Sequence, residues 1–351
     1  MVAPLNWGLG HASRCIPIIR CLLNNNVKVS LAAEGRPAAL LKAEFPDLPL
    51  FELPDYGISY PAKGSMTLHM LKSIPQILRG ISAENRVLNR LIDEQNIDAV
   101  ISDNRYGLYS SKVPCVLITH QLNIKARWGM SIINRFNTQF ISKFHACWIP
   151  DYDTSQNLSG DLGKVPRQNA KYWYIGGLSR FSSRSEPISK DIEVLAVISG
   201  PEPQRTKFEE MVLTKSLNSQ NKVVIVSGKT EESSRIKKGN VEWFASVDSQ
   251  ELQCLMQRAR LVLCRSGYSS LMDLAATGSK AVFVPTPGQT EQEYLAQLHK
   301  DRGNFYFMTQ SRFSWGEMLE QYDKYGGIRR GNSTDFEKTV LQFIQEVKTG
   351  C

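Results

Sequence analysis

The chain has 351 residues, enough for two domains with cores of their own, and no apolar run in it approaches the roughly 20 residues of a membrane span. The first residues lack the segments of a signal peptide, and seven cysteines without a CxxC pair argue for reduced thiols in the cytoplasm rather than a disulfide framework. The net charge of +8 suggests an anionic partner, for which a nucleotide, a phospholipid surface and nucleic acid are the candidates.

The first half of the chain alternates short apolar strands with helices, beginning with a stub of a strand at 2–5. Further strands are expected at 27–33, 48–53, 98–103, 114–120, 146–150 and 172–177, and helices at about 16–23, 37–43, 68–96 and 131–144. This alternation is the doubly wound α/β pattern. We therefore expect an N-terminal Rossmann-like domain over residues 1–181.

The turn Gly8-Leu9-Gly10-His11 follows the first strand directly and opens a helix. Ligands bind to open α/β sheets at the carboxyl ends of the strands, where His11 would project. The positive end of a helix lowers an imidazole's pKa, which keeps the ring neutral and able to accept a proton. We interpret His11 as a catalytic base. The alternative is a packing turn with a structural histidine that caps its own helix.

Asp103 ends the strand expected at 98–103, in the same crevice as His11. A carboxylate there could bind one ring nitrogen of His11, fix the tautomer and stabilise the imidazolium. The alternative is that Asp103 caps the segment 104–109. His120, at the end of the neighbouring strand, is the second candidate for the base, or an acceptor contact.

The pattern restarts after a polar stretch at 182–190, which we expect to be a linker. Five strands of a second parallel sheet are expected at 192–198, 223–226, 241–244, 261–264 and 281–284, within a C-terminal domain over 191–333. Thr334-x-x-Glu337 is a capping box, which predicts a final amphipathic helix over 334–349.

Two glycine turns of this second domain predict contacts with an anion. Gly200 and Arg205 lie where a strand passes through a loop into a helix, and the alternative there is a plain helix start. Beyond Gly267, free N–H groups and the dipole of a short helix point at one spot. Arg265 would add a fixed positive charge, and a serine of the pair 269–270 would cap the helix.

Polar side chains beyond that turn predict a nucleotide-sugar site. Asp273 lies on the short helix, placed to accept a hydrogen bond from a sugar hydroxyl. Glu291-Gln292-Glu293 supplies three polar side chains at the start of the next helix. Amides for a phosphate, a carboxylate for a ribose and a polar cluster for a second sugar fit one ligand.

This stretch resembles the donor-binding signature of GT-B glycosyltransferases, in particular family 28, the branch of the cell-wall N-acetylglucosaminyltransferase. The residues that match in order and spacing are Arg265, Gly267, Asp273, Val284-Pro285 and Glu291-Gln292. The family more often has Glu where this chain has Asp273.

The resemblance implies two Rossmann-like doubly wound α/β domains facing a cleft, with the terminal helix packed back on the first domain. It also implies an inverting, metal-independent hexosyltransferase that moves a hexose or N-acetylhexosamine from a UDP-type donor to a saccharide or lipid-linked acceptor, with His11 and Asp103 as catalytic residues. Donor contacts would come from Ser199, Gly200, Arg205, Phe244, Arg265, Gly267, Tyr268, Ser269, Ser270, Asp273, Glu291, Gln292 and Glu293. The acceptor side would comprise Asn6, Trp7, Gly8, Gly10, Arg14 and His120.

No metal or cofactor is expected besides the nucleotide-sugar substrate, because no His/Cys/Asp cluster has metal-site spacing. Asp151-Tyr152-Asp153 spells the metal-binding DxD of another glycosyltransferase fold, but it follows a strand of the first domain. We interpret it as a loop.

The segment 125–144 mixes basic residues with an apolar stripe at 133, 136, 140 and 144. We favour a helix packed on the sheet, with snorkelling basic side chains. The alternative is an interfacial helix that contacts anionic lipid at the inner face of the membrane.

Other functions stay open. Gly8 to Cys15 also fits the opening of nucleotide-sugar hydrolases and, more distantly, epimerases, in which His11 would activate water. A nucleotide-sugar binder without chemistry is the non-enzyme alternative. Nucleic-acid binding is the alternative with the weakest support, since no run of Lys and Arg residues carries interleaved aromatic residues.

Overall fold

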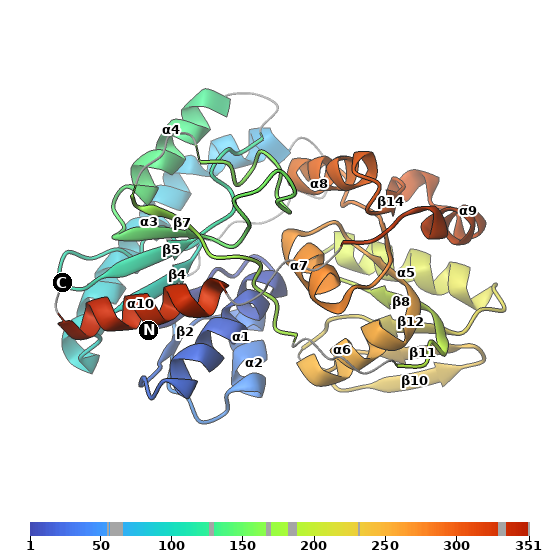
Figure 1. The fold of residues 1–351 in the computed structure, drawn as a ribbon, viewed down its shortest axis with the longest axis horizontal. Coiled ribbons are helices and arrows are strands. Elements are labelled where there is room, and N and C mark those ends of the chain that lie inside the picture. Colours follow the sequence, from blue (N-terminus) through green and yellow to red (C-terminus); the bar gives the residue numbers. More distant parts are fainter. Residues whose placement is uncertain are drawn as a thin grey trace. The chain divides into compact units, whose positions relative to one another are not determined.

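The computed structural model describes residues 1–54, 56, 66–125, 130–165, 170–181, 188–230, 232–328 and 335–349. The chain forms two compact units (Figure 1). One unit comprises Met1–Leu178 with Asn332–Cys351, and the other comprises Ser179–Gly331. Most of the linker expected at 182–190 lies outside the described residues.

The first unit is built on a seven-stranded parallel sheet with the order β3-β2-β1-β4-β5-β6-β7. Its strands are β1 (Val2–Pro4), β2 (Leu31–Ala32), β3 (Leu50–Phe51), β4 (Val100–Asp103), β5 (Cys115–Ile118), β6 (Ala146–Ile149) and β7 (Tyr172–Tyr174). Its helices are α1 (Leu9–Asn24), α2 (Gly35–Glu44), α3 (Met66–Gln95), α4 (Met130–Ile141) and α10 (Asp335–Thr349). The doubly wound fold predicted for this half is confirmed.

Helices cover both faces of this sheet. On one face, Leu88 of α3 and Ile141 of α4 join a core cluster with the strand residue Leu117. On the other face, α10 packs against α1, and Phe343 of α10 meets the buried Trp148 of β6 edge to face at 5.5 Å (Figure 1). The C-terminal helix therefore belongs to the first unit. Thr334, which the expected capping box places first, lies outside the described residues.

The second unit is also built on a seven-stranded sheet, with the order β10-β11-β9-β8-β12-β13-β14. Its strands are β8 (Ile192–Val197), β9 (Val223–Val226), β10 (Arg235–Lys238), β11 (Val241–Phe244), β12 (Ala259–Cys264), β13 (Ala281–Phe283) and β14 (Tyr306–Phe307). Its helices are α5 (Gln204–Leu217), α6 (Ser249–Arg258), α7 (Tyr268–Thr277), α8 (Thr290–Asp301) and α9 (Trp315–Gln321), with the short 3₁₀ turns η1 (Gln310–Arg312) and η2 (Tyr322–Lys324).

The five parallel strands expected here are present, but the prediction omitted two edge strands. β10 pairs antiparallel with β11, and all four of its residues, Arg235–Lys238, are exposed. A fully exposed strand carries no alternation of apolar and polar residues. β14 has only two residues, too few to show a pattern.

Two features of the helices bear on membrane contact. No helix among the described residues is long and apolar enough to cross a membrane. In α4 the predicted apolar stripe is wrong at Phe136, whose ring is 45% exposed. The buried neighbour Asn137 takes the inward position, accepting a hydrogen bond from Tyr106 and donating one to the carbonyl of Gln121.

Candidate active site and donor-binding edge

The chain passes from β1 into α1 through Gly8, which caps the helix with φ 100° and ψ 171°. Only glycine adopts this backbone conformation without strain. Helix α1 begins at Leu9, so Gly10 lies in its first turn, and the carbonyl of Gly10 accepts a hydrogen bond from the Ser13 hydroxyl. This turn places His11 at the N-terminal end of α1.

His11 and Asp103 are in contact, as the sequence predicted. Asp103 is the last residue of β4 and lies opposite Pro4 of β1, so the carboxylate sits at the strand ends from which α1 starts. The His11 Nδ1 atom lies 2.7 Å from Asp103 Oδ1. Asp103 is completely buried, whereas the His11 side chain is 15% exposed. Solvent therefore reaches the imidazole but not the carboxylate.

Arg14, assigned to the acceptor side from the sequence, is buried beneath this pair. Its Nε donates to Asp103 Oδ2 and its Nη2 donates to Asp103 Oδ1, which makes a two-point contact. The same Nη2 lies 2.9 Å from His11 Nδ1, and Nη1 lies 3.4 Å from Nδ1 of the buried His120. Cys15 adds a long contact, 3.9 Å from its sulfur to Asp103 Oδ2. Arg14 thus contacts the candidate catalytic pair rather than open solvent.

The carboxylate decides which tautomer His11 adopts. Arg14 holds the pKa of Asp103 below its usual range despite the opposing effect of burial, so this carboxylate is ionised and only accepts hydrogen bonds. His11 Nδ1 must then carry the proton, and Nε2 keeps the free lone pair. Burial and the Arg14 charge lower the pKa of His11, against the opposite effect of Asp103. The ring is therefore neutral at pH 7 and able to take a proton.

The remaining acceptor-side residues line the same edge of the sheet. Asn6 lies so close to the start of α2 that a Cβ on Gly35 would stand 3.1 Å from its amide nitrogen. Trp7 is half-buried against a small cluster that contains Leu5 and Ile81. Their contact with an acceptor stays a prediction.

A buried network beside this edge escaped the sequence analysis. Glu84 of α3 is fully buried; it accepts hydrogen bonds from Arg105 Nε, from the Tyr56 hydroxyl at 2.5 Å and from the Gly107 amide at 2.9 Å. Arg105 also donates to the carbonyl of Pro54 at 2.8 Å. The network joins α3 to the segment that follows Asp103. No sequence pattern links residues so far apart.

In the second unit, three loops meet at the carboxyl ends of the adjacent strands β8, β12 and β13. Arg265 joins them, because its terminal nitrogens donate to the carbonyls of Val284, Pro285 and Gln204 at 2.9–3.1 Å. Its guanidinium is buried, 4.1 Å from the centre of the Phe208 ring, and burial lowers its pKa to about 9, so it stays charged at pH 7. The terminal donors of Arg265 therefore organise the three loops, whereas its buried Nε has no hydrogen-bond partner among the described residues. Its contact with a donor stays a prediction.

Helix α7 starts at this edge without a side-chain cap. Its N-cap is Gly267, which has no side chain to accept a hydrogen bond from the first turn of the helix. The prediction that Ser269 or Ser270 caps the helix is wrong, because both lie inside the first turn, after the buried Tyr268. The positive dipole end of α7 therefore lies at this edge without a side-chain cap from its N-cap residue, where an anion would be favoured.

Thr286, which the sequence analysis did not select, lies in the loop after β13. It is 3% exposed, and its buried hydroxyl has no hydrogen-bond partner among the described residues. A Cβ on Gly200, which has φ 109°, would stand 3.9 Å from that hydroxyl. Its position in the sequence, directly after the strand end Val284-Pro285, could have identified Thr286 as a candidate site residue.

Arg205 does not offer the phosphate contact predicted for it. It is buried, and its terminal nitrogens donate to Glu202, to Glu209 at 3.1 Å and to the carbonyl of Ser227 at 3.2 Å. Glu209 also accepts hydrogen bonds from the Ser227 hydroxyl and from Trp243 at 2.7 Å. We assign Arg205 to this internal network. Ser199 and Gly200 of the same loop remain at the strand end.

Asp273, the predicted ribose ligand, faces the start of the second unit. Its Oδ1 accepts a hydrogen bond from Ser179 at 2.7 Å, and its Oδ2 lies 3.8 Å from Arg180 Nε. Burial raises the pKa of Asp273, with Arg180 and Ser179 acting in the opposite direction. A ribose hydroxyl would share this carboxylate with Ser179.

The cluster at the start of α8 shapes the loop before it. Gln292 is buried, and its side-chain oxygen accepts from the Thr286 amide at 2.8 Å. Glu293 accepts from the Gly288 amide at 3.0 Å. Glu291 is half-buried. Gln292 and Glu293 therefore both fix the loop that carries Thr286. The contact of Glu291, Gln292 and Glu293 with the donor sugar stays a prediction.

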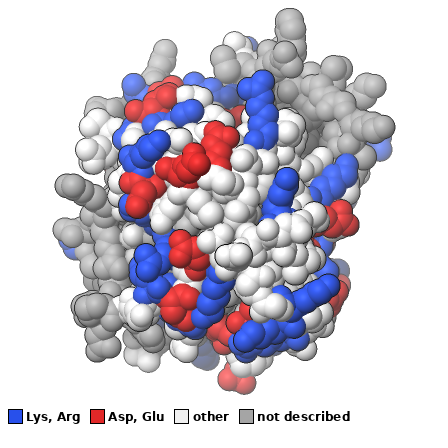
Figure 2. Space-filling model, turned by 90° about the vertical axis from the view of Figure 1, so that its right-hand side faces the viewer, with Lys and Arg blue, Asp and Glu red and all other residues white. Residues whose placement is uncertain are grey.

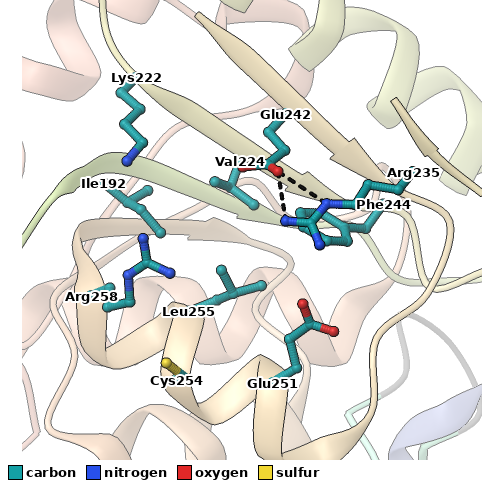
Figure 3. A pocket seen from close by; sticks show the side chains of 10 residues that line it. All are labelled: Ile192, Lys222, Val224, Arg235, Glu242, Phe244, Glu251, Cys254, Leu255 and Arg258. Atoms are coloured by element: carbon teal, nitrogen blue, oxygen red, sulfur yellow. Dashed lines mark hydrogen bonds and ion pairs between the residues drawn. The ribbon is translucent and has the colours of Figure 1, made fainter. Parts of the chain in front are cut away.

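Phe244 is the last residue of β11. With Glu242 and Arg258 it lines a cavity of about 220 Å³ between α6 and the strands (Figure 3). The Arg235 guanidinium covers its ring at 4.3 Å and pairs with Glu242 at 2.7 Å. The donor contact predicted for Phe244 stays a prediction.

The comparisons with known proteins agree with this architecture. The model of the glycosyltransferase family 28 C-terminal domain matches residues 198–325. An uncharacterized glycosyltransferase of Methanosarcina acetivorans is 25% identical, with 84% of this chain and 82% of the relative covered. The UDP-N-acetylglucosamine–N-acetylmuramyl-(pentapeptide) pyrophosphoryl-undecaprenol N-acetylglucosamine transferase of Haemophilus influenzae is 24% identical, over 74% of this chain and 70% of the relative.

A solved structure, MurG of Acinetobacter baumannii, superposes with a TM-score of 0.57 at 13% identity and covers 98% of both chains. The chain is a GT-B glycosyltransferase that resembles family 28. The predicted fold and the predicted enzyme class, a hexosyltransferase, are confirmed.

In this glycosyltransferase the segment Asp151-Tyr152-Asp153 has an internal role. The Asp151 carboxylate accepts hydrogen bonds from the amides of Tyr152, Leu158 and Ser159 at 2.7–2.8 Å and from the Ser159 hydroxyl, so it closes its own loop. No group of three or more His, Cys, Asp or Glu residues within the described ranges could hold a metal ion.

The glycosyltransferase does not gather its positive charge on the face that Figure 2 shows. There, basic and acidic side chains are interspersed among the described residues. The net charge of +8 therefore does not form a single basic patch on that face.

Proposed function

We propose that this glycosyltransferase is inverting and metal-independent, and that it transfers a hexose or N-acetylhexosamine from a UDP-type donor to an acceptor hydroxyl. The contact between His11 and Asp103 carries the proposal, because it supplies a neutral imidazole with a fixed tautomer at the carboxyl edge of the first sheet. The donor would be held by the second unit and the base supplied by the first.

In the proposed reaction, His11 Nε2 takes the proton of the acceptor hydroxyl while its oxygen attacks the anomeric carbon of the donor. Asp103 stabilises the imidazolium that forms. The bond from the anomeric carbon to the diphosphate oxygen breaks as the new bond forms, and UDP leaves. A displacement of this kind inverts the anomeric centre.

The positive dipole end of α7, which has a glycine as its N-cap, supports a metal-free departure of the diphosphate. Amides fixed in place stabilise charge as it develops, with the dipole of α7 and the buried Arg265 charge adding to the effect. The remaining donor contacts that we retain are Ser199, Gly200, Phe244, Asp273, Glu291, Gln292 and Glu293. The UDP moiety is proposed from the name of the Haemophilus relative.

For the acceptor we propose a saccharide or a lipid-linked saccharide, by analogy with that relative. Peripheral contact with an anionic membrane stays a prediction, supported by the exposed Phe136 and Arg135 side by side on α4. The cytoplasmic location also stays a prediction.

The proposal is tested first by binding and then by turnover. A thermal-shift panel of nucleotides and nucleotide sugars should give its largest stabilisation with uridine diphosphate compounds, since ligand stabilisation grows with concentration over affinity. With the donor identified, His11→Ala and Asp103→Asn should each lower turnover by roughly 10²–10⁴. EDTA should leave the rate unchanged.

The matched control is His145→Ala in the same unit, because His145 is 47% exposed and lies 3.9 Å from Glu346, outside the site. Normal turnover by both His11→Ala and Asp103→Asn would refute the mechanism. Release of UDP from the donor at full rate without an acceptor would instead select the hydrolase, since the same imidazole can activate water.

A further inference from the structure

Arg14 lies on the same face of α1 as His11, three residues further along, and is 2% exposed. It spans the Asp103 carboxylate with Nε on one oxygen and Nη2 on the other. A planar guanidinium bound at two points fixes the plane of a carboxylate. Only Oδ1 of Asp103 then faces the imidazole, at 2.7 Å from His11 Nδ1.

The groups that face His11 have opposing charges. Asp103 of β4 favours the protonated imidazole, whereas Arg14 of α1 and His120 beyond β5 favour the neutral one. The Cys15 thiol contacts Asp103, at 3.9 Å from Oδ2. Burial of the ring has the largest effect and also favours the neutral imidazole, and Arg14 adds to it by offsetting the Asp103 charge that would otherwise favour a protonated His11.

We propose that Arg14 is a positioning residue, which holds the Asp103 carboxylate toward His11 and keeps the imidazole neutral between turnovers. The inference rests on the proposed function, in which His11 is the base. It differs from a merely structural role, in which Arg14 would only neutralise a buried carboxylate and leave the imidazole unaffected.

The first test follows His11 itself and needs no substrate. The imidazole Cε1–H signals of the full chain are titrated by NMR, with the His11 signal identified by its loss in His11→Gln. The midpoint of the wild-type chain should lie below the ordinary histidine value of about 6.5. In Arg14→Gln it should rise by about 1–3 pH units, because the facing carboxylate then acts without the opposing Arg14 charge.

Arg14→Lys is the conservative variant. A lysine keeps the charge but binds as a point, so it cannot hold both carboxylate oxygens. Its His11 midpoint should stay near that of the wild type, while kcat falls at least about tenfold with KM little changed, as expected for lost orientation. The control is Arg20→Gln on the same helix, because Arg20 is 44% exposed and pairs with Glu44 at the surface.

The pH dependence of kcat/KM gives the second readout. The acid limb reports the protonation of His11 in the free enzyme, so it should move to higher pH in Arg14→Gln and stay in place in Arg14→Lys. The Arg14→Gln enzyme should be slow at pH 7 and recover most of its rate near pH 9.

An unchanged His11 midpoint in a folded Arg14→Gln protein would overturn the proposal. If Arg14→Gln does not fold, Arg14→Lys decides: wild-type kcat would overturn the proposal, and a fall in kcat with an unmoved midpoint would support it. Normal turnover by His11→Ala would instead refute the proposed function. The NMR midpoint of His11 would still show whether Arg14 keeps the imidazole neutral.

Discussion

The Thr286 hydroxyl is a buried polar group that the protein itself does not satisfy. Leaving such a group unpaired costs about 1–3 kcal/mol. Its backbone amide is already bonded to Gln292, and the hydroxyl faces the backbone of Gly200 among the loops that follow β8 and β13. Its position among these loops suggests that its hydrogen-bond partner is a phosphate or sugar oxygen of the nucleotide-sugar donor.

Thr286→Val replaces that hydroxyl with a methyl group of similar size. Donor affinity should fall about 10-fold or more, as expected for a lost hydrogen bond to a charged group, while the melting temperature should stay unchanged or rise slightly. Calorimetric titration with the donor and thermal unfolding measure the two effects. Thr286→Ser, which keeps the hydroxyl, is the control. Unchanged donor affinity in Thr286→Val would mean that the hydroxyl does not contact the donor.

Single residues were predictable where a strand end fixed their place. His11 and Asp103 both lie at the carboxyl edge of one sheet, and sequence position was enough to bring them together. Arg14, Arg205 and Arg265 were not predictable in the same way. A sequence shows that a side chain is charged, but the carbonyls and carboxylates that bind it come from segments distant along the chain.

At the level of elements, α7 is an uncapped ten-residue helix that begins at the junction of three loops. Natural helices usually have a Ser, Thr, Asp or Asn cap at this position. Gly267 has φ −72° and ψ 147°, which any residue adopts, and an added Cβ would touch nothing nearer than the Ser270 hydroxyl at 3.9 Å. A side chain would therefore fit, and its absence leaves the positive end of α7 without a side-chain cap from this position.

Gly267→Asp should stabilise the protein and weaken donor binding. The new carboxylate can cap the helix, and replacing glycine reduces the flexibility of the unfolded chain. Together these effects should add about 0.5–1.5 kcal/mol to the free energy of unfolding. The same carboxylate would occupy the place of the diphosphate and repel it, so affinity for UDP should fall at least about tenfold. Chemical denaturation and calorimetric titration check the two effects.

Gly267→Ala is the matched control, because it removes the flexibility of glycine without adding an acceptor or a charge. It should keep most of the affinity for UDP. If Gly267→Asp binds UDP as tightly as the wild type, the diphosphate does not bind at the start of α7.

The elements themselves were largely predictable, because most strands are short apolar runs that end at a turn residue. α7 ends at Gly278, with φ 64°, as expected from the sequence. The exceptions are positions whose burial does not follow from the local pattern of apolar and polar residues. β10 is exposed along its whole length, and Phe136 interrupts the stripe of α4 while the polar Asn137 faces inward. Tertiary contacts, which local patterns do not encode, decide such positions.

At the scale of the whole molecule, the second unit is inserted into the first. The chain leaves the first unit after Leu178 and returns to it at Asn332. The helix that completes the first unit, α10, packs against α1, which carries His11 and Arg14. The C-terminal helix α10 therefore packs on the N-terminal helix α1 and stabilises the first unit.

Phe343→Ala tests this dependence. Phe343 is 3% exposed and packs on Trp148, so its truncation should lower the stability of the first unit by about 3–5 kcal/mol. In a calorimetric scan we expect one transition to fall by about 10 °C, while the other transition still rises when UDP is added, because the ligand stabilises only the unit that binds it. Leu341→Ala is the control on the same helix, since Leu341 is 39% exposed and should change the stability little. Loss of the UDP-dependent shift in Phe343→Ala would show that the nucleotide site depends on the first unit, and would contradict its assignment to the loops after β8, β12 and β13.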